Sequence, residues 1–117
     1  SSMSPTLIFD RDGKLFATLG SPGGSRIIGY VTKTVIGLLD WGLDMQAAID
    51  LPHHTNRNGA TELEKGTAIT VHADALRKLG HEVRIRTLTS GLHGIRVTPH
   101  GYDGGADRRR EGVALGD

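Results

Sequence analysis

The first alternation of apolar and polar residues along the chain predicts a β-hairpin. Thr6–Phe9 and Leu15–Leu19 are short apolar segments, and Asp10–Gly13 between them has the Asp and Gly content of a tight turn. Residues 20–24 then form a loop of glycine, serine and proline, whose composition disfavours regular structure. Ser25 at the end of this loop is a suitable N-cap for a helix.

Helical spacing begins directly after this loop. Apolar residues recur every three or four positions from Arg26 to about Trp41, which predicts one buried helix face, and Gly42 is expected to end the helix. Asp44 can cap a second, short helix over Met45–Ile49, which Pro52 terminates.

The second half of the chain is less regular. Residues 52–66 are polar and predict a long loop. A third helix is expected over 71–79, in which Val71, Ala75 and Leu79 share a face and Gly80 closes the end.

Two further strands complete the predicted elements. Val83, Ile85 and Thr87 alternate with charged residues, and Ile95 and Val97 mark another strand, whereas the segment from Gly101 is rich in Gly, Asp and Arg. This order predicts an α/β (α+β) fold with a mostly antiparallel sheet and packed helices, in a single domain over 1–117. The strands are too few for an independent large sheet, which indicates part of a larger structure.

The composition limits the classes of partner and cofactor that the chain is expected to bind. The 117 residues carry 14 Lys+Arg against 13 Asp+Glu, so no broad field favours nucleic acid or a membrane surface. The chain has no cysteine, which excludes thiol nucleophiles and cysteine-ligated zinc. No apolar run approaches the ~20 residues of a membrane span. We therefore expect no nucleic-acid partner, no membrane span and no metal or other cofactor.

Two clusters could carry chemistry. In Ser21–Arg26 the paired Gly23 and Gly24 leave their amides unhindered at a helix start, where an anion or a developing oxyanion can bind; a plain glycine turn is the alternative. Ser1 and Ser2, with Ser4, can donate hydrogen bonds to a carboxylate, and a solvated terminus is the alternative there.

These two clusters carry a family resemblance. Ser-Ser-Met-Ser-Pro-Thr at 1–6, followed by a hairpin and by Gly-Ser-Pro-Gly-Gly-Ser-Arg-Ile at 20–27, resembles the small subunit of the γ-glutamyltransferases (γ-glutamyl transpeptidases), which are N-terminal-nucleophile hydrolases. The likeness continues through 42–49, Pro52-His53-His54 and Ala106–Ala114, and so spans the chain.

The resemblance implies a partial αββα sandwich and acyl transfer from a γ-glutamyl donor such as glutathione to water or an amine. It assigns donor-carboxylate binding to Ser1 and Ser2, and the oxyanion hole to Gly23 and Gly24. It places the nucleophilic threonine upstream, so residues 1–117 alone are expected to be inactive. The implied partners are a large subunit and the rest of the small subunit, and the implied location is periplasmic or extracellular, with no signal peptide in these residues.

Other candidates carry less weight. Ser1 could itself be a terminal nucleophile, but the resemblance gives it a binding role. His53 and His54 are adjacent, which suits a loop or packing role better than a metal site. Arg108–Arg110 lie among acidic residues and predict a solvated or ion-paired tail. A non-catalytic module derived from the same fold is the alternative function, and incomplete strand edges predict self-association of this piece.

Overall fold

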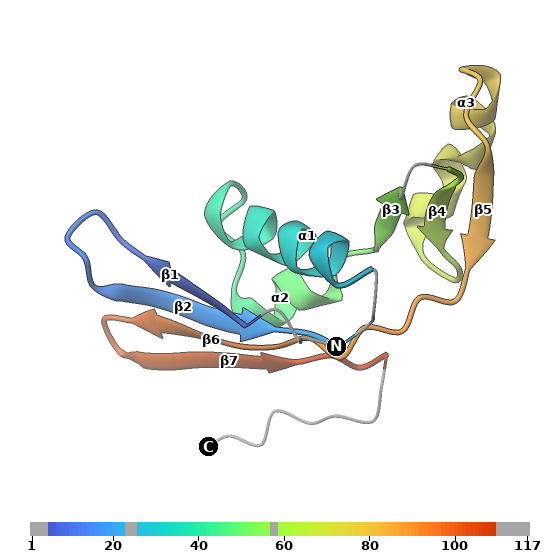
Figure 1. The fold of residues 1–117 in the computed structure, drawn as a ribbon. Coiled ribbons are helices and arrows are strands. Elements are labelled where there is room, and N and C mark those ends of the chain that lie inside the picture. Colours follow the sequence, from blue (N-terminus) through green and yellow to red (C-terminus); the bar gives the residue numbers. More distant parts are fainter. Residues whose placement is uncertain (1–4, 23–25, 57–58, 110–117) are drawn as a thin grey trace. The chain divides into compact units, whose positions relative to one another are not determined.

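The protein falls into two compact units. The computed structural model describes residues 5–22, 26–56 and 59–109, and the units are residues 1–51 with 89–117 (the larger unit) and 52–88 (the smaller unit) (Figure 1). The larger unit holds β1 (Thr6–Phe9), β2 (Leu15–Gly20), α1 (Ile27–Leu39), α2 (Met45–Asp50), β6 (His93–Thr98) and β7 (Gly101–Ala106). The smaller unit holds β3 (His54–Asn56), β4 (Thr61–Glu64), the 3₁₀ helix η2 (Ala68–His72), α3 (Ala73–Lys78) and β5 (Val83–Arg86). The single domain expected over 1–117 stays a prediction.

The larger unit is built on an antiparallel sheet with strand order β1-β2-β6-β7. The predicted hairpin is confirmed, and its turn is fixed by Asp10, whose Oδ1 accepts from the backbone N–H of Asp12 at 2.9 Å and of Lys14 at 3.0 Å. Gly13 adopts φ +79°, a conformation that favours glycine and allows the chain to reverse.

Strand β7 is an element of the larger unit that the sequence pattern missed. It pairs with β6 along its whole length, from Thr98↔Gly101 to His93↔Ala106. Its glycines hide the alternation of a strand, and one of them is required by packing. A Cβ on Gly105 would lie 3.0 Å from the backbone N and Cα of Gln46, so only glycine admits α2 at this distance.

Helices α1 and α2 cover one face of this sheet, as Figure 1 shows. The predicted cap of α2 is confirmed, since Asp44 Oδ1 accepts from the Ala47 N–H at 2.7 Å. At the other end of α2 the buried Lys33 of α1 donates from Nζ to the carbonyls of Ala48 and Ile49, at 2.9 and 2.8 Å. A cation at a helix C-terminus complements the helix dipole, so Lys33 fastens the two helices together.

The opposite face of the sheet is open among the described residues. Leu7, Thr18 and Ile95 lie opposite one another across three strands, and Tyr102 lies further along the same face. Leu7, Ile95 and Tyr102 are 61%, 45% and 81% exposed. One sheet with helices on one side only is the arrangement expected for a partial αββα sandwich, the fold that the resemblance implies.

The smaller unit corrects two predictions. The expected loop over 52–66 contains β3 and β4, which pair with each other antiparallel, while β4 pairs with β5 in parallel. The strands escaped detection because most of their buried side chains are polar: Thr55, Glu62 and Glu64 are buried beside the apolar Leu63. Thr55 Oγ1 donates to Glu62 Oε1 at 3.1 Å across the pair.

The expected helix over 71–79 is also corrected. It is divided between η2 and α3, and the predicted face is wrong because Val71 and Leu79 are 74% and 76% exposed. The buried position is Ala73, which joins Leu63 and Val83 in a small core. Both units together confirm the mixed α/β class with mostly antiparallel pairing, β4–β5 being the parallel exception.

Candidate functional site

Two predicted motifs leave the sheet at the same end: the serine motif, residues 1–6, and the glycine motif, residues 20–27. Thr6 at the start of β1 pairs with Leu19 near the end of β2, because the strands are antiparallel. Ser1 and Ser2 precede β1 by a few residues, and Gly23 and Gly24 follow β2 as closely. These four residues lie outside the described residues, so their roles stay predictions. The hairpin nevertheless joins their flanking residues by direct backbone pairing.

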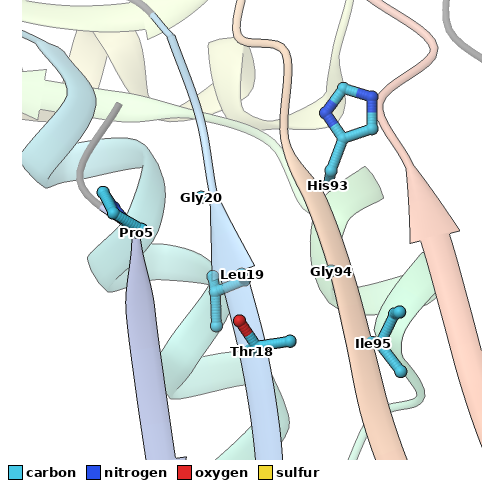
Figure 2. A pocket seen from close by; sticks show the side chains of 7 residues that line it. All are labelled: Pro5, Thr18, Leu19, Gly20, His93, Gly94 and Ile95. Carbon is cyan, nitrogen blue, oxygen red and sulfur yellow. The ribbon is translucent and has the colours of Figure 1, made fainter. Parts of the chain in front are cut away.

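A cavity of about 410 Å³ lies at this end of the sheet. Figure 2 shows its lining, which comes from the start of β1, the end of β2 and the start of β6: Pro5, Thr18, Leu19, Gly20, His93, Gly94 and Ile95. Most of this lining is apolar or backbone. The cavity is therefore bounded by Pro5 of the serine motif and by Gly20, which begins the glycine motif.

His93 is a polar residue that the sequence pattern did not connect with this place. It pairs with Gly20 across β2 and β6, and it lines the cavity. Its Nδ1 lies 2.7 Å from the Gly91 carbonyl oxygen, which can only accept, so Nδ1 carries a proton. In the neutral ring this leaves Nε2 as a hydrogen-bond acceptor. Only the strand register, which the sequence does not reveal, brings His93 next to the glycine motif.

Buried polar groups hold the backbone around Ser21, near the start of the glycine motif. Ser21 and Asp107 are 0% and 1% exposed. The Asp107 carboxylate forms an ion pair with Arg109, with Nη1 to Oδ1 at 3.1 Å. Arg109 also donates to the carbonyls of Ile49 and Leu51, at 2.9 and 2.8 Å. The predicted ion-paired tail is thus confirmed for Arg109, and it is anchored on the end of α2.

The two adjacent histidines, the remaining candidates from the sequence, lie in different surroundings. His53 is buried and His54 is exposed, so the adjacent rings lie in different surroundings, as a packing role predicts. Across residues 5–22, 26–56 and 59–109, no group of three or more His, Asp or Glu side chains could hold a metal ion. No helix within those ranges has the length and apolar character needed to cross a membrane.

These features define a class of protein: a layered, mostly antiparallel α/β fold in which a serine motif and a glycine motif flank one end of the sheet. The sequence profile named gamma-glutamyltranspeptidase matches residues 1–117. The chain belongs to this family, which confirms the resemblance drawn from the motifs.

Individual relatives support the same family assignment. The chain is 34% identical to the glutathione hydrolase proenzyme of Bacillus subtilis over 99% of its own length, and 36% identical to that of Escherichia coli over 94%. It is also 32% identical to the Acylase ACY 1 proenzyme of a Pseudomonas strain. It spans about a fifth of the length of the two hydrolase proenzymes, 20% and 19%.

Solved structures give the same result for the fold. An acivicin-inhibited γ-glutamyltranspeptidase superposes with a TM-score of 0.84 at 31% identity, over 96% of this chain and 62% of that one. The T380A mutant of the Helicobacter pylori γ-glutamyltranspeptidase superposes with a TM-score of 0.83 at 28% identity, over 94% of this chain and 62% of the mutant. The predicted fold class, which the motifs implied to be that of N-terminal-nucleophile hydrolases, is thereby confirmed.

Proposed function

We propose that this chain forms part of a γ-glutamyltransferase that cleaves γ-glutamyl amides such as glutathione. The observation that carries the proposal is the Thr6↔Leu19 pairing, which brings the last residue of the serine motif beside the residue that precedes the glycine motif, next to one cavity. Two adjacent groups, one for a carboxylate and one for an oxyanion, suit a donor that carries both an α-carboxylate and a reactive amide.

The reaction proceeds in two acyl-transfer steps. A threonine supplied by the rest of the protein attacks the γ-carbonyl carbon, its proton passes to a base such as its own α-amino group, and the C–N bond breaks as the amine leaves with a proton. The resulting ester then loses the γ-glutamyl group to water, an amino acid or a peptide amine, which restores the hydroxyl. No cofactor enters either step.

Residues of this chain bind the donor and stabilise its charge. Ser1 and Ser2 donate hydrogen bonds to the α-carboxylate, an interaction present before and during the reaction. The amides of Gly23 and Gly24 face the oxygen that becomes negative in the tetrahedral intermediate. Such donors lower the barrier because they are already oriented where charge develops.

The rest of the enzyme covers what this chain leaves open. Leu7, Ile95 and Tyr102 form an exposed apolar face on the sheet, and its natural cover is the remainder of the small subunit, with the large subunit completing the donor site. The same face would drive self-association of residues 1–117 when they are made alone. The periplasm or the cell exterior is the proposed location, as the family resemblance implies.

The test is turnover of a γ-glutamyl anilide by the complete protein and by residues 1–117 alone. The complete protein should release the aniline, with or without a chelator, and the isolated piece should release none at any concentration. Absence of turnover in a correctly processed complete protein would favour the alternative, a non-catalytic module on the same fold. Because one relative is an acylase proenzyme, a non-glutamyl amide belongs in the same assay as a comparison donor.

A further inference from the structure

The buried hydroxyl of Ser21 connects two segments that are distant in the sequence. Ser21 Oγ accepts a hydrogen bond from the Gly91 N–H at 3.1 Å and donates one to the Pro22 carbonyl at 2.6 Å. The residue is 0% exposed, so water does not compete for either bond. Ser21 therefore ties the start of the glycine motif to the loop before β6.

Asp107 holds this loop, residues 90–92, through its side chain and its backbone. One carboxylate oxygen, Oδ2, accepts from the Ser90 hydroxyl and from the Leu92 N–H, the latter at 3.1 Å. The backbone adds a bond from the Asp107 N–H to the Leu92 carbonyl at 2.8 Å. Ser90 and Leu92 are both fully buried. The Gly91 amide that reaches Ser21 thus sits between two residues that Asp107 fixes.

Holding the Pro22 carbonyl has a covalent consequence for the next residue. A peptide unit is planar, and its C=O and N–H point in opposite directions when it is trans. The Pro22 carbonyl and the Gly23 amide belong to the same peptide unit. A group that restrains the carbonyl also restrains the direction in which the amide can donate.

We propose that Ser21 is a positioning residue: its hydroxyl, held by the 90–92 loop that Asp107 binds, fixes the Pro22 carbonyl, and through that peptide unit it supports the proposed oxyanion contact of Gly23. The inference rests on the proposed acyl transfer and adds to it residues that do not touch the substrate. The effect belongs to the transition state, because the oxyanion develops only there.

The test compares Ser21→Ala with a matched control, Thr34→Val, in the complete processed enzyme. Thr34 is also 0% exposed, and its hydroxyl donates to the Tyr30 carbonyl at 2.9 Å within α1, so both variants lose one buried hydroxyl. Ser21→Ala should lower kcat by about 10- to 100-fold with the donor KM changed less than about twofold, short of the ~10²–10³ typical for loss of a whole oxyanion donor. Thr34→Val should keep the wild-type kcat, and thermal melting of both variants records how much stability each hydroxyl contributes.

A second measurement, hydrogen exchange, tests the positioning role of Ser21 even if the enzyme turns over no γ-glutamyl donor. Amide hydrogen exchange in a peptide spanning 20–27 should be faster in Ser21→Ala and unchanged in Thr34→Val. Wild-type kcat in processed Ser21→Ala would overturn the proposal, as would unchanged exchange in that peptide. Failure of the wild-type enzyme on every γ-glutamyl donor would instead contradict the proposed function. The exchange rates alone would then test whether Ser21 restrains the backbone of residues 20–27.

Discussion

The two units differ in where their buried charged groups lie relative to the predicted motifs. In the larger unit, buried charged groups bind chosen backbone atoms: Lys33 and Arg109 both reach the Ile49 carbonyl, and Asp107 binds the Leu92 amide. In the smaller unit the apolar core is Leu63, Ala73 and Val83, with Ile69 and Leu76 partly buried against it. Its buried glutamates lie on β4, where Glu62 accepts from Thr55 Oγ1 and Glu64 accepts from the His53 N–H, so they act within this unit.

This difference indicates where positional accuracy is needed. A buried charge costs free energy unless every hydrogen bond is made, so it fixes its neighbours in one arrangement. The larger unit has such groups beside the end of the sheet from which both predicted motifs leave. The smaller unit holds neither motif, so we expect its substitutions to change stability and leave catalysis intact.

The largest effect is expected for Gly24→Val in the complete enzyme. A side chain there would crowd or tilt the peptide that donates to the oxyanion, so kcat for acylation should fall by about 10²–10³ while KM changes little. Gly59→Val is the matched control, because Gly59 lies in the smaller unit and a Cβ there meets no atom within 4 Å. Pre-steady-state acylation of processed enzyme is the measurement. Wild-type acylation by Gly24→Val would leave the glycine motif as a structural turn only.

Leu63→Ala should separate stability from catalysis. Leu63 is 2% exposed in the core of the smaller unit, and such a truncation costs about 2–4 kcal/mol. Native-state hydrogen exchange in β4 should report that loss. The kcat and KM of the complete enzyme should stay within about twofold, since no predicted site residue lies in residues 52–88. A large drop in kcat in this variant would contradict the separation drawn between the units.

Ser2→Ala should give the smallest effect and a different kinetic pattern. It removes a donor to the α-carboxylate that acts in the ground state and the transition state alike. A hydrogen bond to a charged group contributes about 1.5–3 kcal/mol, so the donor KM should rise about tenfold or more with a smaller change in kcat. Ser4→Ala is the control, because the resemblance gives Ser4 no carboxylate contact. A fall in kcat with unchanged KM would remove Ser2 from donor binding.

The sequence correctly predicted those elements that are stabilised by residues close to them in the chain. The hairpin followed from the Asp10–Gly13 turn, and α2 from its Asp44 cap. Elements held by distant partners were missed. Strand β7 depends on pairing with β6, and β4 carries buried glutamates whose neighbours lie on other segments. The third helix was misread because its buried face is set by the sheet beside it.

The site divides in the same way. Ser1, Ser2, Gly23 and Gly24 were predicted from motifs, and they remain predictions because they lie outside the described residues. His93 and Ser21 gain significance only from the strand register and the loop before β6. No spacing in the sequence reveals that Gly91 donates to Ser21 across seventy positions.

The most direct test of the acyl-transfer account is the intact mass of the processed protein, quenched during turnover of a γ-glutamyl donor. Acyl transfer predicts a covalent γ-glutamyl adduct on the subunit that contains this chain, at the threonine that the family resemblance places upstream of the serine pair. The adduct should disappear when water or an amine acceptor completes the reaction, and it should accumulate far more slowly in Gly24→Val. Steady turnover with no adduct at any time, or an adduct carried by residues 1–117 themselves, would contradict it.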